Sequence, residues 1–265
     1  MGAEPGAPAA GSELQLERLT WPEIRDELEA GKDTVICVVG SIEQHGPHLP
    51  CETDCHYGLE MALRAARRLG TALVAPVIRP GCSQHHLGFP GTISVPGDVL
   101  VGVVREQLRS LIDTGFSRIV LTSSHGGNFV PLAGAVPSFE LLCRERDVQL
   151  IPVLELQRWI DALKAAPNAR GLRQLDIPAV QADLIETSMM LALHPALVRR
   201  DRIEPGFVGD FDLEDSFAER GLKALTDNGI LGDPTPATAE LGEEILAHLE
   251  RYLLDAIAAG GEVRA

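Results

Sequence analysis

The chain has 265 residues, enough for two small domains or one larger α/β domain, and its apolar fraction of 45% can bury a continuous core. Its 38 Asp and Glu residues outnumber its 23 Lys and Arg residues, which gives a formal net charge of −15. This excess disfavours a nucleic-acid partner, because proteins that bind a phosphate backbone neutralise it with clustered cations. The chain contains no apolar run of about 18 residues, so we expect no membrane-spanning helix.

The N-terminal segment and the cysteines indicate the cellular compartment. Residues 1–14 are rich in Gly, Ala and Pro and lack the basic and apolar regions of a signal peptide, so we expect a disordered tail there. The five cysteines are scattered; Cys51 and Cys55 are four apart, but no second pair follows to complete a zinc finger. We therefore expect reduced thiols and a cytoplasmic protein.

Apolar β-rich stretches alternate with helical patterns as far as residue 153. In chain order the predicted elements are a strand at 34–40, a helix at 57–69, a strand at 71–78, a helix at 98–114, a strand at 118–122, a helix at 130–146 and a strand at 149–153. Strand–helix alternation at this spacing predicts a mainly parallel sheet flanked by helices on both faces, a three-layer α/β fold.

The C-terminal part departs from this alternation. The pattern predicts a long loop at 165–180, a helix at 182–193, an irregular stretch at 204–233 and a long helix at 237–259. Because neither an internal repeat nor a linker is visible, we expect one domain from residue 15 to residue 265.

Histidines and a carboxylate gather where the predicted strands end. Glu43 and His45 follow the first strand, His85 and His86 follow the second, and His125 follows the third. In an open parallel sheet, ligands bind beyond the carboxyl ends of the strands. The sequence therefore predicts a functional site at this edge.

Glu43 and His45 form the first candidate ligand pair. In an extended segment, residues two apart point to the same side, and Asp54 returns to this pair after a loop that contains prolines. Carboxylates and imidazoles together suit Zn²⁺, Mn²⁺ or Fe²⁺ rather than a thiolate-type site. The alternative is a capped loop with a surface ion pair.

The segment Ser-Ser-His-Gly-Gly-Asn at 123–128 is the second candidate. Gly126 and Gly127 allow a sharp turn beside a bound ion or substrate, and His125 falls at the same sheet edge. A plain strand-to-helix turn is the alternative. A dinucleotide-binding loop is disfavoured, because the Gly-x-Gly-x-x-Gly spacing is absent.

Glu186, at the start of the predicted helix 182–193, is the third candidate. The helix dipole favours a carboxylate there even without a ligand, and Asp183 competes with it for either role.

These motifs resemble the creatininase (creatinine amidohydrolase) family, in particular its His-Gly-Gly-Asn branch. That branch includes the peptidase of the mycofactocin precursor and a formamide deformylase. The matching segments occur in family order: residues 40–54, 86–92, 123–128, 185–198 and 229–243.

The resemblance implies a metal-dependent hydrolase that cleaves the C–N bond of a small cyclic amide or formamide through a metal-activated water. It implies two divalent ions (Zn, Mn or Fe) with Asp54 between them, and Glu186 or His86 passing a proton to the leaving nitrogen. It also implies a homo-oligomer, often a hexamer. The implied metal ligands are Glu43, His45, Asp54, His125 and Glu186.

Three positions depart from the family pattern. Gln181 stands where the family often has a histidine, Gly127 where creatininase proper has a glutamate, and His85 where a glutamate is more frequent. Gln181 cannot shuttle a proton near neutral pH, so His86 is the expected stand-in. The residues expected to contact substrate are Gly126, Gly127, Asn128, Gln181 and Trp159.

Other functions stay open at this point. One is a mycofactocin-type precursor peptidase, which would accept an extended chain. Another is a non-catalytic member of the family that binds metal and ligand. A nucleotide-binding α/β protein is disfavoured, because both the P-loop and the dinucleotide fingerprint are missing.

Overall fold

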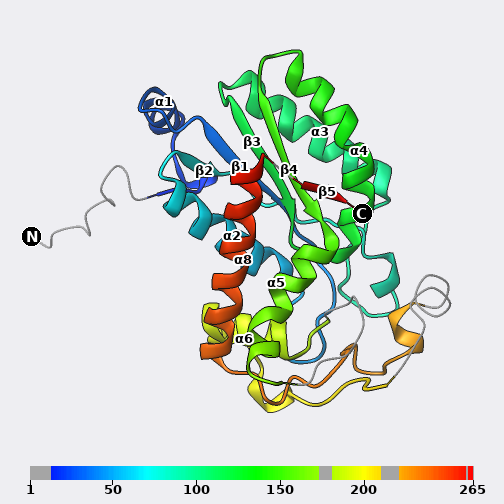
Figure 1. Cartoon of the computed structure of the whole chain (residues 1–265). Helices are drawn as coiled ribbons and strands as arrows, with labels where there is room; N and C mark the ends of the chain where they lie inside the picture. Colours follow the sequence, from blue (N-terminus) through cyan, green and yellow to red (C-terminus); the bar gives the residue numbers. More distant parts are fainter. Residues whose placement is uncertain (1–12, 173–180, 210–220, 261, 265) are drawn as a thin grey trace, which may run out of the picture.

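The computed structural model describes residues 13–172, 181–209, 221–260 and 262–264. Their centre is a five-stranded, all-parallel sheet in the order β2-β1-β3-β4-β5, which confirms the predicted fold class (Figure 1). The strands are β1 (Thr34–Val39), β2 (Ala72–Val74), β3 (Arg118–Ser123), β4 (Gln149–Glu155) and β5 (Glu262–Arg264).

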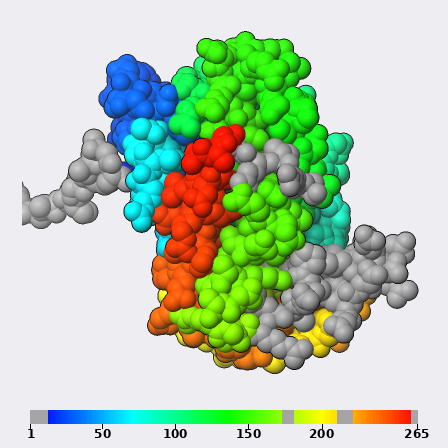
Figure 2. All heavy atoms as spheres, viewed as in Figure 1, coloured from blue at the N-terminus to red at the C-terminus, as the bar shows by residue number. Residues whose placement is uncertain are grey.

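Helices cover both faces of the sheet. They are α1 (Trp21–Glu29), α2 (Thr53–Leu69), α3 (Gly97–Asp113), α4 (Phe129–Arg144), α5 (Leu156–Ala169), α6 (Leu184–Leu193) and α8 (Ala239–Ala259). The helices α2, α5 and α6 all pack against α8, whereas α3 and α4 pack against each other on the opposite face (Figure 1). In the space-filling view, α5 and α8 lie side by side on the surface (Figure 2). Among the described residues, none of the helices has both the length and the apolarity needed to cross a bilayer.

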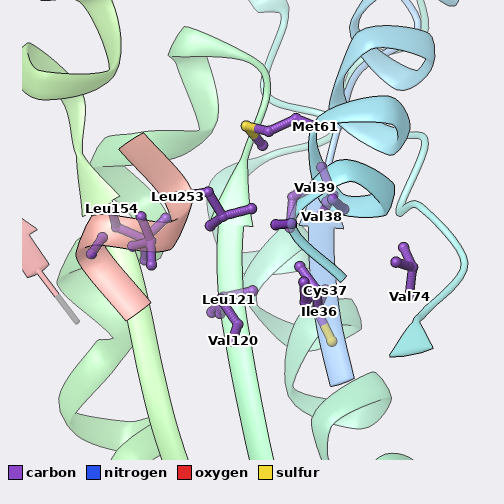
Figure 3. Close-up of a cluster of buried hydrophobic side chains, with 14 of the residues drawn as sticks. Ile36, Cys37, Val38, Val39, Met61, Val74, Val120, Leu121, Leu154 and Leu253 are labelled. Carbon is purple, nitrogen blue, oxygen red and sulfur yellow. The ribbon is translucent and has the colours of Figure 1, made fainter. Parts of the chain in front are cut away.

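The central strand β1 shows why this sheet forms. All six of its residues are buried, as expected for a strand with helices on both faces. Apolar side chains of β1, β3, α2 and α8 meet around it, among them Val38, Leu121, Met61 and Leu253 (Figure 3). This continuous core fixes the strand ends and therefore positions the polar segments that follow them.

The structure differs from the predicted elements in several places. The helix α1, the helix α5 and the strand β5 were not predicted. The loop predicted at 165–180 is wrong for residues 165–169, where α5 continues through the buried Pro167; residues 173–180 lie outside the described part. Residues 13 and 14 of the predicted tail are described, and the Leu14 carbonyl accepts a hydrogen bond from the Val74 amide; residues 1–12 lie outside the described part.

The strand predicted at 71–78 is shorter than expected. It ends at Val74, just before Pro76, which has no N–H to donate to a neighbouring strand. The chain still follows β1 beyond this point, because the Ile78 amide donates to the Val38 carbonyl.

Candidate metal centre

Four separate segments bring the predicted ligands to one place at the carboxyl edge of the sheet. Glu43 and His45 follow β1, Asp54 and Glu186 lie in the first turns of α2 and α6, and His125 follows β3. All five side chains are buried, with at most 5% of any residue exposed.

The five side chains form two groups that share Asp54. One group is Glu43, Asp54 and His125, and the other is His45, Asp54 and Glu186; within each group the donor atoms lie within 4.8 Å of one another. Asp54 serves the groups with different oxygens: Oδ2 lies 3.3 Å from His125 Nδ1, and Oδ1 lies 3.3 Å from His45 Nε2. A carboxylate shared in this way suits two neighbouring cations.

The backbone fixes the orientation of the His45 ring. His45 Nδ1 lies 3.1 Å from the Glu43 carbonyl oxygen, to which it donates its proton. Nε2 is thereby left with a lone pair, directed at Asp54 Oδ1 (3.3 Å) and Glu186 Oε1 (3.5 Å). A histidine that ligates a metal is commonly held by a hydrogen bond of this kind from its other nitrogen.

The His125 ring is held in the same way through its opposite nitrogen. Nε2 lies 3.2 Å from the Cys82 carbonyl, so Nδ1 faces Glu43 Oε2 and Asp54 Oδ2, at 3.3 Å each. In both groups a lone pair on an imidazole nitrogen faces carboxylate oxygens. This arrangement is repulsive unless a proton or a metal cation lies between them.

The buried polar atoms fit a pair of divalent cations. Among the described residues, His45 Nε2 and Asp54 Oδ2 are buried without a hydrogen-bond partner. Unpaired buried polar atoms are costly, and a cation in each group would satisfy both of them. The donors are nitrogen and oxygen only, the set that suits Zn²⁺, Mn²⁺ or Fe²⁺.

The buried carboxylates of the two groups raise the pKa of both imidazoles. Burial lowers the pKa of His125, but the carboxylates of Glu43 and Asp54 outweigh burial and raise it to about 9. For His45, burial is likewise outweighed by Glu186 and Asp54, and the pKa lies well above its usual range. Protons therefore occupy these imidazoles in the metal-free protein, and a divalent cation would displace them.

Two residues predicted to contact substrate form hydrogen bonds with the backbone of the site. Asn128 Oδ1 accepts the Cys82 amide at 2.9 Å, and its Nδ2 donates to the Gly40 carbonyl at 2.9 Å. Gln181 Nε2 donates to the Gln44 carbonyl at 2.7 Å. Both side chains thereby hold the ligand-bearing segments in place.

The other predicted substrate contacts differ in their surroundings. Gly126 is half-buried with open space where a Cβ would point, whereas Gly127 lies against the backbone of Cys82. Trp159 belongs to the hydrophobic core and packs on Phe129, with ring centroids 5.1 Å apart. Its position gives no support to a role in substrate binding.

The two adjacent histidines lie beside the group that contains His125. His86 Nε2 lies 3.4 Å from Glu43 Oε1, and its Nδ1 lies 3.2 Å from Gln44 Nε2, so protein groups contact both ring nitrogens. The His85 ring stacks on His125, with centroids 6.1 Å apart and an angle of 7° between the planes. Burial lowers the pKa of His85 to about 3, which keeps the ring neutral.

Tyr57 is a supporting residue that sequence reasoning missed. Its hydroxyl donates to the Ser124 carbonyl, and Ser124 Oγ donates to the Asp54 carbonyl at 2.8 Å. The two hydrogen bonds join α2, which carries Asp54, to the backbone beside His125. In the sequence, Tyr57 has the spacing of an ordinary core residue of a helix, so no signal distinguished it.

Replacing Tyr57 by Phe is expected to lower the free energy of unfolding of the metal-free protein by about 1–3 kcal/mol, because the buried Ser124 carbonyl loses its donor. Urea denaturation measures the change. The matched control is Tyr252→Phe: among the described residues, the buried Tyr252 hydroxyl has no partner, so little change is expected. Equal losses in the two variants would contradict the assigned role of Tyr57.

The fold and the donor groups define the class: an α/β protein with a candidate two-ion centre at the carboxyl edge of a parallel sheet. A family model described as "Creatininase: Creatinine amidohydrolase" matches residues 17–257. The chain therefore belongs to the creatininase family, whose named members are hydrolases, and it is an enzyme of that family.

Three similar proteins illustrate the likeness. A mycofactocin precursor peptide peptidase of Mycolicibacterium smegmatis is 34% identical over 84% of this chain and 83% of its own. A creatinine amidohydrolase of Pseudomonas putida is 32% identical over 90% of this chain and 94% of its own. A solved structure named "Creatininase Mn" superposes with a TM-score of 0.76 at 27% identity, covering 94% of this chain and 98% of that one.

Proposed function

We propose that the chain is a metal-dependent amidohydrolase that cleaves the C–N bond of a small cyclic amide or formamide. The observation that carries the proposal is the shared Asp54, whose two oxygens serve two separate donor groups. The superposition on a creatininase named for manganese is consistent with divalent ions at these positions.

In this proposal Glu43, Asp54 and His125 hold one ion, and His45 and Glu186 complete the second position with Asp54. Bound there, two divalent ions would supply Lewis acidity and lower the pKa of a water molecule toward neutrality. The protein's contribution is to keep the donors buried and correctly oriented, so that little reorganisation is needed during the reaction.

The leaving nitrogen must receive a proton before it departs. Of the two groups predicted for this step, we propose Glu186, because it belongs to one of the two donor groups and His86 does not. Its Oε2 accepts the Ala182 amide at 2.5 Å, and its Oε1 lies 3.5 Å from His45 Nε2. The ring nitrogens of His86 contact Gln44 and Glu43.

A second candidate function is cleavage of a peptide substrate. It is favoured by the 34% identity to a mycofactocin precursor peptide peptidase over most of both chains. The donor groups would serve either reaction, since both break an amide C–N bond. The two candidates differ in the length of substrate that the site must admit.

A substrate panel with metal removal tests both candidates. The protein is stripped with a chelator, reloaded with Zn²⁺ or Mn²⁺, and offered a lactam, a formamide and a peptide whose last two residues can be released. We expect the protein to hydrolyse one of these three classes of substrate, to lose the activity when the metal is removed and to regain it when the metal is restored. Undiminished turnover by the stripped protein would contradict the metal-dependent mechanism.

We also propose a cytoplasmic homo-oligomer. All five cysteines are free thiols, in keeping with a reducing compartment. Apolar side chains stay exposed on α3 and α4, among them Val99, Val103 and Val130, and a partner subunit would cover them. Light scattering on the purified protein measures the assembly.

A further inference from the structure

Gln44 lies between two candidate ligands that serve different groups, Glu43 and His45. Although it has no place among those ligands, it is only 5% exposed and all of its polar groups are engaged. Its amide N–H donates to Thr92 Oγ1 at 3.1 Å, and its carbonyl accepts Gln181 Nε2 at 2.7 Å. The backbone between the two groups is therefore held from both sides.

The surrounding backbone also fixes the orientation of the Gln44 side-chain amide. Oε1 accepts the Gly46 amide at 3.0 Å, and Nε2 donates to the Gly229 carbonyl at 2.9 Å. Exchanging the oxygen and the nitrogen would place the amide N–H groups against the Gly46 N–H and the amide oxygen against the Gly229 carbonyl oxygen. The second N–H of the amide consequently points to His86 Nδ1, 3.2 Å away, which must accept.

Gly229, which accepts from the Gln44 side chain, lies in a segment distant in the sequence. Its φ of +80° is a conformation that other residues rarely adopt, and a Cβ there would lie 1.9 Å from Gln44 Oε1. Only glycine allows the backbone to approach the amide this closely.

The tautomer of His86 follows from the orientation of Gln44. With Nδ1 accepting from Gln44, the ring proton lies on Nε2, which faces Glu43 Oε1 at 3.4 Å. The other oxygen, Oε2, faces His125 Nδ1 at 3.3 Å. His86 therefore contacts one oxygen of Glu43 and leaves the other directed at the candidate ion position.

We infer that Gln44 is a positioning residue, which fixes His86 as the Nε2–H tautomer and through it sets which oxygen of Glu43 is presented to the ion. This inference rests on the proposed function, because it takes Glu43 to be a metal ligand. It assigns His86 to the orientation of Glu43 rather than to proton transfer.

The tautomer can be measured without any metal. In the metal-free protein, ¹⁵N NMR distinguishes a protonated Nε2 from a protonated Nδ1; the chain has eight histidines, so the His86 signals are identified by their loss in His86→Asn. We expect Nε2–H in the wild type. In Gln44→Glu an oxygen replaces the donor, so we expect protonation of Nδ1.

The affinity for metal is measured separately with Gln44→Met, which removes the hydrogen bonds of the Gln44 side chain and adds no charge. Calorimetric titration with Zn²⁺ is expected to show a loss of about 10–100-fold, the range found when a group that orients a ligand is removed. The matched control is Gln107→Met: Gln107 Nε2 also donates to a backbone carbonyl, that of Pro76, but from the half-buried side of α3 and outside both donor groups, and no loss is expected.

Either of two results would overturn the inference. The first is a proton on Nδ1 of His86 in the wild-type protein, a measurement that does not depend on any variant folding. The second is an affinity for Zn²⁺ in Gln44→Met equal to that of the wild type. Failure of the proposed function is distinguishable, because it would appear as wild-type protein that does not bind Zn²⁺, or that binds it equally well after Asp54→Asn.

Discussion

Replacing Asp54 by Asn is expected to empty both metal positions and to lower the rate of hydrolysis by more than about 100-fold. Removing a group that only orients a ligand already costs about 10–100-fold, and Asp54 is a candidate ligand of both ions. The loss of its charge also leaves the His45 and His125 imidazoles with one carboxylate fewer between them.

Metal content by mass spectrometry and kcat/KM on the substrate identified by the panel measure this effect. The matched control is Asp98→Asn, which makes the same change in the first turn of α3, where the side chain is exposed. Asp98→Asn should keep both ions and full activity. An Asp54→Asn protein with two ions and undiminished kcat/KM would refute the proposed centre.

Replacing Gly127 by Ala is expected to have the second largest effect. The added Cβ would lie 2.2 Å from the Cys82 carbonyl oxygen and 2.7 Å from His125 Nε2, so it would force apart the hydrogen bond that orients His125. We expect a loss of about 1–3 kcal/mol in the free energy of unfolding, as for other overpacked sites, together with weaker metal binding.

Gly126→Ala is the matched control, because a Cβ at Gly126 meets nothing within 4 Å. It should change stability by no more than about 0.5 kcal/mol, as surface substitutions usually do. Urea denaturation of the stripped proteins and titration with Zn²⁺ measure the two parts of the effect. If Gly127→Ala behaves like Gly126→Ala, the orienting role of the Cys82 carbonyl is wrong.

The strands β1 to β4 could be predicted because their buried residues are mostly apolar, whereas the short β5 lacks such a pattern. β1 is buried throughout, and its pattern differs sharply from the polar segment that follows. The helix α1 was not predicted, although its sequence carries helix signals: Thr20 and Glu23 form a capping box at its start, and Ile24 and Leu28 lie on one face and pack, half-buried, against the core. The helix α5 was not predicted at any point of its length, and its last turn contains Pro167, a residue type that usually ends a helix.

The meeting of the candidate ligands was predictable for the same reason, since parallel strands bring their carboxyl ends to one edge. The backbone carbonyl that each side chain contacts could not be predicted. The hydrogen bonds of Asn128 and Gln181, two residues expected to contact substrate, go to Gly40, Cys82 and Gln44. Such contacts depend on loop positions far apart in the sequence, which no local pattern encodes.

The two donor groups also change what a measured stability means for this protein. His45, Asp54 and Glu186 come from separate segments, so an ion bound among them would act as a cross-link that exists only in the folded chain. At a free metal concentration 100 times the Kd, such binding adds about 2.7 kcal/mol to the free energy of unfolding. Metal binding and folding are then one linked equilibrium. A substitution that weakens a metal ligand lowers the free energy of unfolding just as a packing defect does, and the two are told apart by measuring the metal-free protein.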